Sequence, residues 1–375
     1  MEFGDEFVFN FCNRIWRQRK REPSGVNLLK MKKIFVHSPY WLIKGGGERY
    51  SLTAAECLTE NFEVLADVPG REYLVNSGRH LGINLDRVKI LSGESYMKNM
   101  SKFYGVFWVS DGSIPFLLTK RKVIHFQAPF KKVGGRSFKN KLKIFGTRVI
   151  CNSFYTKGFI DSEYGVMSGV VYPPVEIDKF KPIRKQKLIL TVGRFSRSSQ
   201  YKRPEVLIRT FKRLVDNGLR GWRMAVVGIV EDEESRIAAV GLRTLAKGFP
   251  IAIRTDLSHD RLIRLYEQAT IYWHAAGFGV DLNKNPERAE HFGISTVEAM
   301  AAGAVPIVFA VGGPKEVVRP EKDGLWWQTL PELESQTLRL IQDESLRERL
   351  VNEGRERSKL FNKRRFCQEI GRLFK

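Results

Sequence analysis

Short apolar segments alternate with helical ones along most of the chain, and this alternation limits the fold more than any other feature of the sequence. Residues 33–39, 62–68 and 123–126 have the length and the apolar content of buried strands. Helical or loop stretches separate them. Strands that alternate with helices form βα units, and such units place their strands in a parallel sheet. We therefore predict an α/β fold.

The alternation then occurs a second time. Residues 187–194 form a predicted strand that runs into a glycine turn, and residues 204–217 and 223–230 continue as helix and strand. Pro173 and Pro174 lie between the two series, and paired prolines make a stiff linker. A chain of 375 residues also exceeds what one hydrophobic core usually serves. We therefore predict two α/β domains joined at the proline pair.

The same features set the predicted domain limits. The first domain covers residues 31–175, the second covers residues 176–355, and residues 356–375 form a helix that we expect to pack back on the first domain. Residues 1–30 are an N-terminal extension, in which an aromatic cluster precedes a basic segment. One interpretation places this extension on an anionic bilayer surface. The other is an extension without fixed structure, or upstream sequence ahead of a start at Met31.

Basic residues exceed acidic ones, with 63 Lys and Arg against 41 Asp and Glu, and the formal net charge is +22. Such a charge favours an anionic partner: a nucleic acid, an anionic membrane surface or a phosphorylated substrate. An evenly basic surface typical of the organism is the simpler interpretation. The basic residues are dispersed, and no RNA- or DNA-binding motif accompanies them. We therefore expect no nucleic acid partner.

The sequence contains no predicted membrane span, because its apolar runs are far shorter than the roughly 20 residues that a span requires. The acidic first residues lack the basic and then apolar order of a secretory signal. Cys12, Cys57, Cys151 and Cys367 have no metal-ligand spacing, and we interpret them as reduced thiols. We therefore expect a cytoplasmic protein, with peripheral attachment at the inner face of the membrane as a further expectation.

Two glutamates, Glu290 and Glu298, lie eight positions apart. Ser295 and Thr296 are predicted to begin the helix that carries Glu298, and Gly303 is predicted to end it. A largely helical segment would separate the two carboxylates by roughly 12 Å along its axis. A carboxylate pair that acts on one glycosidic bond needs less than about 10 Å. The spacing instead suits a ligand with two hydroxyl-rich ends and an anionic middle, such as a nucleotide diphosphate sugar.

Further candidate residues follow predicted strands. Arg194 and Lys202 come after the first strand of the second domain, and two cations suit a diphosphate. Gly46 and Gly47 come after the first strand of the first domain, where backbone can approach a phosphate or a sugar closely. His125 lies at a strand end, where open α/β sheets bind ligands, although a lone histidine is more often structural. A solvated loop and a plain tight turn are the simpler interpretations of the cations and the glycines.

Several of these motifs together resemble the family-4 retaining glycosyltransferases of the GT-B fold. They are Gly193-Arg194-Phe195 with Lys202, the Glu290-x7-Glu298 pair, Gly312-Gly313-Pro314, and the glycine turn that ends in Glu48-Arg49. The segment from Glu290 to Gly303 looks most like the mannosyltransferase branch that extends lipid-linked oligosaccharides. The resemblance runs from about residue 31 to the C-terminus. It implies two Rossmann-like domains that face each other across a cleft.

The resemblance also implies a role for each matching position. Glu290 would bind hydroxyls of the donor sugar near the reacting carbon, and Glu298 would bind the nucleotide ribose. Arg194 and Lys202 would hold the diphosphate. The remaining contacts would be the close backbone approach of Gly46 and Gly47, a main-chain cradle of Phe292, Gly293 and Ile294, and a contact of His125 with the donor sugar.

The implied activity is a metal-independent, retaining transfer of a hexose, of the mannose or glucose type, from a nucleotide diphosphate sugar to a saccharide or lipid-linked acceptor. Same-face attack is implied, with the leaving diphosphate helping to deprotonate the acceptor. No cofactor is expected, because fixed cations and a helix N-terminus would stabilise the leaving group. Alternatives are another GT-B enzyme, such as a nucleotide-sugar epimerase or a phosphorylase, and a basic nucleic-acid-binding protein. Arg194 and Lys202 are farther apart than is common in the family, and the loop 277–288 is unusually long.

Overall fold

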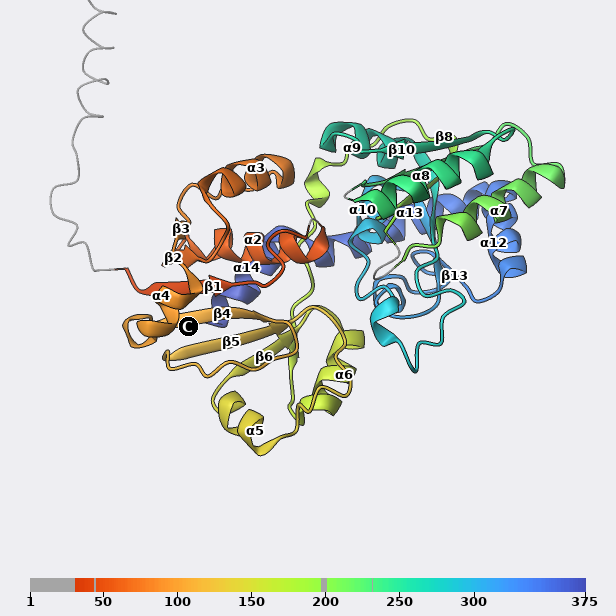
Figure 1. Ribbon diagram of the computed structural model, residues 1–375. Coiled ribbons are helices and arrows are strands. Elements are labelled where there is room, and N and C mark those ends of the chain that lie inside the picture. Colours follow the sequence, from red (N-terminus) through yellow and green to blue (C-terminus); the bar gives the residue numbers. More distant parts are fainter. Residues whose placement is uncertain (1–30, 44, 197–200, 231) are drawn as a thin grey trace, which may run out of the picture. The chain divides into compact units, whose positions relative to one another are not determined.

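Two parallel β-sheets organise the described part of the chain (Figure 1). The computed structural model describes residues 31–43, 45–196, 201–230 and 232–375, and residues 33–375 form one unit by their contacts. The predicted extension 1–30 lies outside the described residues, as does the segment 197–200 between Arg194 and Lys202. Two sheets, each made of parallel βα units, confirm the predicted α/β fold with two Rossmann-like domains.

The first sheet has seven strands in the order β3-β2-β1-β4-β5-β6-β7, and all of its pairings are parallel. The strands are β1 (Lys33–His37), β2 (Glu63–Ala66), β3 (Lys89–Ile90), β4 (Gly105–Ser110), β5 (Arg121–Phe126), β6 (Arg148–Cys151) and β7 (Gly169–Val170). The helices between them are α2 (Gly46–Leu58), α3 (Arg71–Leu81), α4 (Gly93–Lys98), α5 (Phe138–Ile144) and α6 (Phe154–Tyr164), with a 3-10 turn at Met100–Lys102. The strand order reverses between β1 and β4, and open α/β sheets bind ligands at such a point.

The second sheet repeats this arrangement with six strands in the order β10-β9-β8-β11-β12-β13, again all parallel. The strands are β8 (Gln186–Val192), β9 (Arg223–Gly228), β10 (Ile251–Thr255), β11 (Ala269–His274), β12 (Val305–Phe309) and β13 (Leu325–Trp327). The helices are α7 (Pro204–Asp216), α8 (Glu233–Ala246), α9 (His259–Gln268), α10 (Ile294–Ala302), α11 (Pro314–Val317), α12 (Leu330–Gln342) and α13 (Glu344–Ser358). Short 3-10 turns lie at Ile177–Lys179, Pro286–Arg288 and Lys359–Phe361. Here the strand order reverses between β8 and β11.

Local sequence signals explain several helix starts. Ser153 caps α6, because its hydroxyl accepts the N–H of Thr156 at 3.1 Å. Pro204 occupies the first turn of α7, where its missing N–H leaves no helical bond unmade. Asp232 and Ser235 form a reciprocal capping box at the start of α8.

The last helix, α14 (Lys363–Arg372), packs into the core of the first domain although it follows the second domain in the sequence. Phe366, Ile370 and Phe374 are buried there beside residues of α2 and of the first sheet. The Phe374 ring lies over Gly105 on β4, where a Cβ atom would come within 2.8 Å of the ring. The numerical domain limits that we proposed, at residues 175 and 355, stay predictions.

Cys57 of α2 and Cys367 of α14 form a disulfide across 310 residues of sequence. The prediction of reduced thiols is therefore wrong for these two residues. It rested on sequence spacing, which carries no information about partners that only the fold brings together. Cys151 is a free and buried thiol. Among the described helices, none has both the length and the apolar character that crossing a membrane would require.

Candidate active site

The charged centre of the second domain is the carboxylate of Glu290, a residue that is only 6% exposed. Lys202 contacts it through Nζ, and Nε2 of His274 lies 3.4 Å from Oε2. Lys202 follows β8, His274 ends β11, and Glu290 precedes α10. Because β8 and β11 are the neighbours at the switch point, their carboxyl ends place these side chains together. Two residues that the sequence predicted, Lys202 and Glu290, therefore meet.

The electrostatics of this group decide which protons it holds. Burial alone would raise the pKa of Glu290, but the Lys202 ammonium and the His274 ring outweigh that effect and hold the pKa well below its usual range. Burial lowers the pKa of His274, although the Glu290 carboxylate opposes this. Near neutral pH the site therefore holds an ionised Glu290 and a neutral His274. An ionised carboxylate accepts hydrogen bonds from hydroxyls and has no proton to donate.

Lys202 reaches the carboxylate by crossing Gly193, the glycine of the predicted turn after β8. A Cβ atom on Gly193 would lie 2.2 Å from Cγ of Lys202. Gly193 also donates its N–H to the carbonyl of Val227 at 3.0 Å, which ties the turn to β9. Arg194 is the next residue and is half-buried. A second cation, Arg194, thus directly follows the glycine over which the Lys202 side chain passes.

The helix that carries Glu298 begins one residue before the predicted start. Gly293 is its N-cap with φ of 103°, a left-handed conformation that disfavours side chains, and no side chain caps this end of α10. Ser295 and Thr296 therefore lie inside the first turn, which corrects the prediction that they begin it. Ser295 instead accepts the Tyr272 hydroxyl at 2.8 Å. Glu290 precedes the helix, so the estimate of a helical spacing between the carboxylates does not apply to it.

The Gly-Gly-Pro turn holds the segment that contains Glu290. Gly312 and Gly313 pack against the main chain of residues 290–292, and a Cβ atom on Gly313 would come within 2.3 Å of the Cα atom of Phe292. Gly313 donates its N–H to the Glu290 carbonyl at 2.8 Å. Only glycine allows two backbones to approach this closely. The turn therefore fixes the direction of the Glu290 side chain and of the predicted cradle that follows it.

Glu298 faces the first domain. Its Oε1 atom lies 3.5 Å from Nη1 of Arg49 on α2. Burial raises the pKa of Glu298, and the Arg49 guanidinium opposes that effect. The predicted ribose contact of Glu298 stays a prediction, and Arg49 is its ionic partner here.

Gly46 and Gly47 bring the first turn of α2 against two neighbours. A Cβ atom on Gly46 would lie 3.0 Å from Cδ1 of Ile294 at the start of α10, and one on Gly47 would lie 2.3 Å from Oε1 of Gln127. Gln127 also donates to the Gly47 carbonyl at 3.2 Å. The two glycines thus allow the first turn of α2 to lie close to Ile294 and Gln127. The diphosphate that they are expected to approach stays part of the proposal.

His125 does not reach this site. Its ring is fully buried on β5 and stacks on Tyr50 of α2 with ring centroids 4.0 Å apart. Burial lowers its pKa to about 3, so the ring is neutral. The prediction that His125 contacts a sugar is therefore corrected: β5 continues to Phe126, and α2 covers the histidine within the sheet. The residue at the strand end that faces the second domain is Gln127.

His291 is a site residue that the sequence did not reveal as one. It is buried, with Nδ1 3.0 Å from the Gln127 carbonyl and Nε2 3.1 Å from the Glu287 carbonyl. Burial lowers its pKa to about 4, so the neutral ring carries one N–H and donates it to one carbonyl at a time. The residue was visible as the neighbour of Glu290, but nothing in its spacing pointed to carbonyl partners on separate loops.

Glu316 of α11 is a second unpredicted contact between the domains. Its carboxylate accepts the N–H groups of Phe154 and Tyr155, at 2.8 and 2.5 Å, in the first turn of α6. A carboxylate at this end of a helix satisfies free N–H groups and interacts well with the helix dipole. Burial raises the pKa of Glu316, and the two N–H groups oppose that effect.

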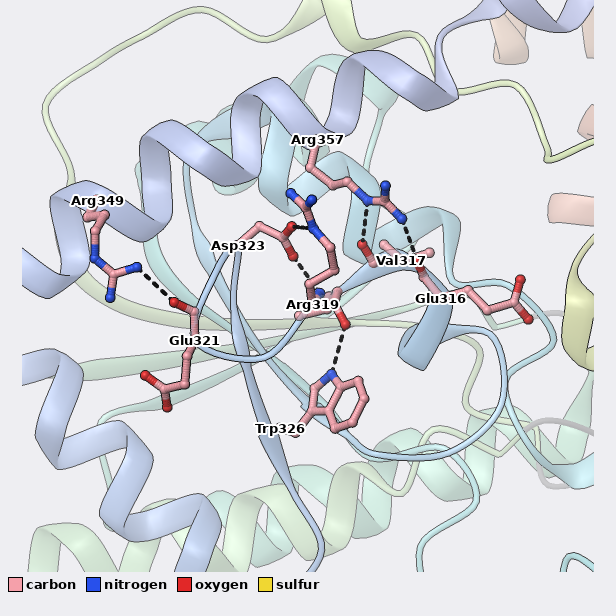
Figure 2. A network of polar contacts seen from close by, with 9 residues as sticks. Glu316, Val317, Arg319, Glu321, Asp323, Trp326, Arg349 and Arg357 are labelled. Carbon is pink, nitrogen blue, oxygen red and sulfur yellow. Dashed lines mark hydrogen bonds and ion pairs between the residues drawn. The ribbon is translucent and has the colours of Figure 1, made fainter.

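Figure 2 shows how the segment that carries Glu316 is held. Arg357 of α13 donates to the carbonyl oxygens of Glu316 and Val317, at 2.7 and 3.3 Å. Farther along, Arg319 pairs with the fully buried Asp323, with Nε and Oδ2 2.5 Å apart. The backbone that presents the Glu316 carboxylate to the first domain is therefore anchored to α13.

A cavity of about 560 Å³ lies beside the charged centre rather than on it. Its walls are the loop that follows β5, at residues 128–133, and a second loop that includes Asn283, Lys284, Pro286 and Glu287. Nζ of Lys131 donates to the Asn283 carbonyl at 2.8 Å, and the Tyr155 hydroxyl donates to the Pro286 carbonyl at 2.8 Å. The unusually long loop 277–288 thus forms one wall of a cavity with several lysines around it.

Comparison with known proteins connects this geometry to a family. Residues 175–357 match the family described as Glycosyl transferases group 1. Over 210 residues the chain is 27% identical to the GDP-Man:Man(3)GlcNAc(2)-PP-Dol alpha-1,2-mannosyltransferase of Dictyostelium discoideum, a match that covers 50% of this chain and 39% of that protein. The protein of the same name from Kluyveromyces lactis is 22% identical over an alignment 391 residues long. This alignment covers 83% of this chain and 67% of the Kluyveromyces protein.

A solved structure has a similar overall fold. A glycosyltransferase from Rickettsia africae superposes with a TM-score of 0.69 at 15% identity, over 92% of this chain and 98% of that one. At this identity the likeness concerns the fold. In the Dictyostelium match, the chain spans about two fifths of the length of its relative. The predicted resemblance is confirmed: residues 175–357 match the model of the glycosyl transferases group 1 family, within a chain that has the two Rossmann-like domains of the GT-B fold.

Proposed function

We propose that this protein is a retaining glycosyltransferase that moves mannose from GDP-mannose to a lipid-linked oligosaccharide. The names of the Dictyostelium and Kluyveromyces relatives support this donor and this class of acceptor. The observation that carries the proposal is the contact of Lys202 with an ionised Glu290 at the switch point of the second sheet. A cation and a hydrogen-bond acceptor side by side suit a ligand whose phosphate adjoins a sugar with several hydroxyls.

Each end of the donor has a binding group in this proposal. Glu290 accepts hydrogen bonds from hydroxyls of the mannose, and Glu298 accepts them from the ribose. Lys202 and Arg194 hold the diphosphate, and the N–H groups at the start of α10 and the main chain of Phe292 add to its cradle. Before the donor binds, Lys202 neutralises Glu290. Binding then lets the ammonium interact with the diphosphate as well, while Glu290 turns to the sugar.

The proposed transfer uses the binding groups for charge rather than for acid–base chemistry. The mannose–phosphate bond breaks, and the electron pair leaves with the diphosphate. The acceptor hydroxyl forms the new glycosidic bond on the same face, and its proton goes to the departing phosphate oxygen. Fixed cations that stabilise the developing charge account for much of the rate in such a reaction. A Glu290 with a strongly lowered pKa is consistent with this role, because it cannot act as a general acid near neutral pH.

We also propose that the reaction needs no metal ion, since Lys202 and Arg194 supply the positive charge at the diphosphate. A lipid-linked acceptor places the enzyme at a membrane surface, and we propose the inner, cytoplasmic face. The disulfide between Cys57 and Cys367 removes the thiol argument for a cytoplasmic protein, so this location rests on the substrates alone. Activity that persists in EDTA would support the first point.

The first experiment is a panel of nucleotide sugars, in which slow hydrolysis of each is measured without acceptor. We expect GDP-mannose to be hydrolysed faster than UDP-glucose or UDP-N-acetylglucosamine. In parallel, GDP should raise the melting temperature more than UDP does, because ligand at about 100 times its Kd adds about 2.7 kcal/mol to the folded state. Preference for a uridine nucleotide in both assays would contradict the proposed donor. Release of a sugar phosphate would support a phosphorylase, and an epimerised nucleotide sugar would support an epimerase.

The second experiment replaces Glu290 or Arg194 by alanine. We expect turnover to be lost while the melting temperature shows a folded protein. Arg264→Ala, on the exposed side of α9, is the matched control and should keep full turnover. Full activity of either site variant would refute the assignment. A salt-sensitive gel shift with nucleic acid, without any response to nucleotides, would favour a nucleic-acid-binding protein.

A further inference from the structure

One stretch of the first domain is entirely free of acidic residues. Residues 112–160 contain eleven Lys or Arg and neither Asp nor Glu. The stretch covers most of the loop between β4 and β5, then β5, the loop between β5 and α5, α5, β6 and the start of α6. A net charge of this size within a single stretch is a local property, and the dispersed charge of the whole chain does not account for it.

Within this stretch, α5 exposes its apolar residues instead of burying them. The helix contains no buried residue, and Phe138, Leu142 and Phe145 are 76%, 59% and 82% exposed. Spacings of four and three residues place these three side chains on one side of the helix, with Phe145 at its C-cap. Lys139 and Lys141 are exposed between them. An ordinary surface helix turns its apolar side to the core, so this one has the opposite orientation.

The orientation of α5 is held by specific contacts. Ile144 packs against the core cluster beneath the helix. Nζ of Lys143 donates to the Ile114 carbonyl at 2.6 Å, and Nζ of Lys122 donates to the Phe145 carbonyl at 2.8 Å. Because the inner side of α5 is fixed in this way, its apolar side stays directed away from the domain. Figure 1 shows α5 at the margin of the first domain, beyond β6.

The segment that receives Lys143 carries further exposed apolar residues. Phe116 and Leu118, close in sequence to Ile114, are more than half exposed, while Leu117 between them is buried in the core. Large aromatic and aliphatic side chains interleaved with lysines on one exposed surface are unusual for a protein without a partner. We call α5 together with residues 114–118 the α5 face.

We propose that the α5 face binds the surface of an anionic lipid bilayer. The composition separates a bilayer from a protein partner: protein interfaces are depleted in lysine at their centres, whereas at a bilayer lysines reach the headgroups while neighbouring aromatic and aliphatic side chains enter the acyl boundary. The lysines of this acid-free stretch match the negative charge of such a surface. The proposal does not depend on the donor or the transfer reaction.

The proposal also has a consequence for the site. Ten residues, 128–137, connect Gln127 at the domain contact with the start of α5, and the first six of them line the 560 Å³ cavity. A chain anchored through the α5 face would therefore hold one wall of this cavity close to the membrane. A lipid-linked substrate would then reach the cavity without leaving the bilayer.

The test is co-sedimentation of the full chain with phosphatidylcholine vesicles that contain either no phosphatidylserine or roughly one third of it. We expect binding to the anionic vesicles that weakens as salt is added. The double variant Phe138→Ser with Phe145→Ser should bind about tenfold more weakly, and so should Lys139→Glu with Lys141→Glu. The matched control is Ile237→Ser with Val240→Ser, which removes two exposed apolar side chains from α8 and should bind like the parent.

Melting temperature and GDP-mannose hydrolysis in solution confirm that the variants are folded, and neither should change, because α5 buries no residue and lies outside the proposed donor site. Parent-like binding by both α5 variants would overturn the proposal and place any membrane contact elsewhere, including residues 1–30. An equal loss in the α8 control, or no binding by the parent chain, would also overturn it. Loss of vesicle binding with hydrolysis intact separates this proposal from the proposed function.

Discussion

The two domains contribute different kinds of groups to the candidate active site. The second domain supplies charged and titratable side chains: Lys202, His274 and Glu290. The first domain supplies mainly main-chain groups and glycines. They are the glycines at the start of α2, the Gln127 carbonyl, and the N–H groups that Glu316 accepts. Arg49 is the main charged exception.

This difference explains why the second domain is easier to recognise from sequence. Side-chain chemistry demands particular residues at particular positions, and the family match is confined to residues 175–357. A backbone carbonyl or N–H is present at every residue, so a domain that offers such groups can vary its sequence and keep its contacts. The first domain is then free to adapt its surface to the acceptor and, as we propose, to a bilayer.

The largest expected effect comes from the charged centre. Lys202→Met should lower turnover about a hundred- to a thousandfold, because the developing charge on the diphosphate loses a fixed cation. Glu290→Gln should have an effect of similar size. The double variant should be little worse than either single one, since the two residues act as a unit. Steady-state turnover of GDP-mannose measures all three.

Lys322→Met, an exposed lysine of the second domain, is the control for the lost charge and should retain the parent rate. Additive losses in the double variant would show that Lys202 and Glu290 act independently. Parent-like turnover in either single variant would remove the charged centre from the reaction, and with it the contrast between the domains.

The next effect tests the backbone role of the first domain. Gly47→Ala should lower turnover about tenfold to a hundredfold, because the new Cβ atom would lie 2.3 Å from Gln127 and shift the approach of α2. Stability should change little, because the preference of a helix for alanine over glycine, about 1 kcal/mol, offsets part of the cost of displacing the Gln127 side chain. Gly158→Ala in α6 is the control, because nothing lies within 4 Å of its Cβ position. Equal turnover in both variants would mean that close approach at Gly47 is not needed.

A smaller effect should follow from weakening the contact between the domains. Glu316→Gln should cost roughly 1 kcal/mol, because the α6 N–H groups lose a charged acceptor. Hydrogen exchange should then accelerate at the amides of Phe154 and Tyr155. Glu332→Gln is the matched control, since Glu332 accepts N–H groups only within the second domain, at Gln328 and Thr329. Unchanged exchange at Phe154 would show that α6 does not depend on Glu316.

The smallest effect is a dependence of stability on pH at Glu298. Its pKa is raised from 4.5 in the folded protein, so the protonated form is favoured there, and the stability that this provides is lost as the pH rises through the folded pKa. Glu298→Gln never ionises. It should therefore melt about 1–2 °C higher than the parent at neutral pH, with the difference vanishing below about pH 4. Thermal scans across this range test the sign, and a variant that melts lower at neutral pH would contradict it.

Much of the fold follows from local patterns that the sequence displays directly. The predicted helix 204–217 corresponds to α7 within one residue, and the strands that we predicted correspond to strands of the two sheets within a few residues. Short apolar runs between turns are buried on both faces of a parallel sheet, and this burial depends little on the rest of the chain. The joining of Lys202 to Glu290 was predictable for a similar reason, because parallel strands end at one edge.

What escaped prediction depends on contacts between distant segments. His125 has a position suited to a site, but Tyr50 covers it, and no local pattern shows which strand residues a helix will cover. α10 begins at Ile294 instead of Ser295, with Gly293 as its N-cap, and the Gly312 and Gly313 turn packs on the backbone that precedes it. The roles of His291 and Glu316 likewise require carbonyl and N–H partners that carry no sequence signature.

The return of α14 to the first domain has a consequence for synthesis. The ribosome completes the whole second domain before it makes Phe366, Ile370 and Phe374, which fill the core beside α2 and cover Gly105. The core of the first domain therefore stays incomplete, with part of its apolar surface exposed to solvent, while the second domain is synthesised. A stop codon ahead of Lys363 would damage the domain made first and spare the one made second. Quality control during translation should accordingly act on the first domain until residues 363–374 have emerged from the ribosome.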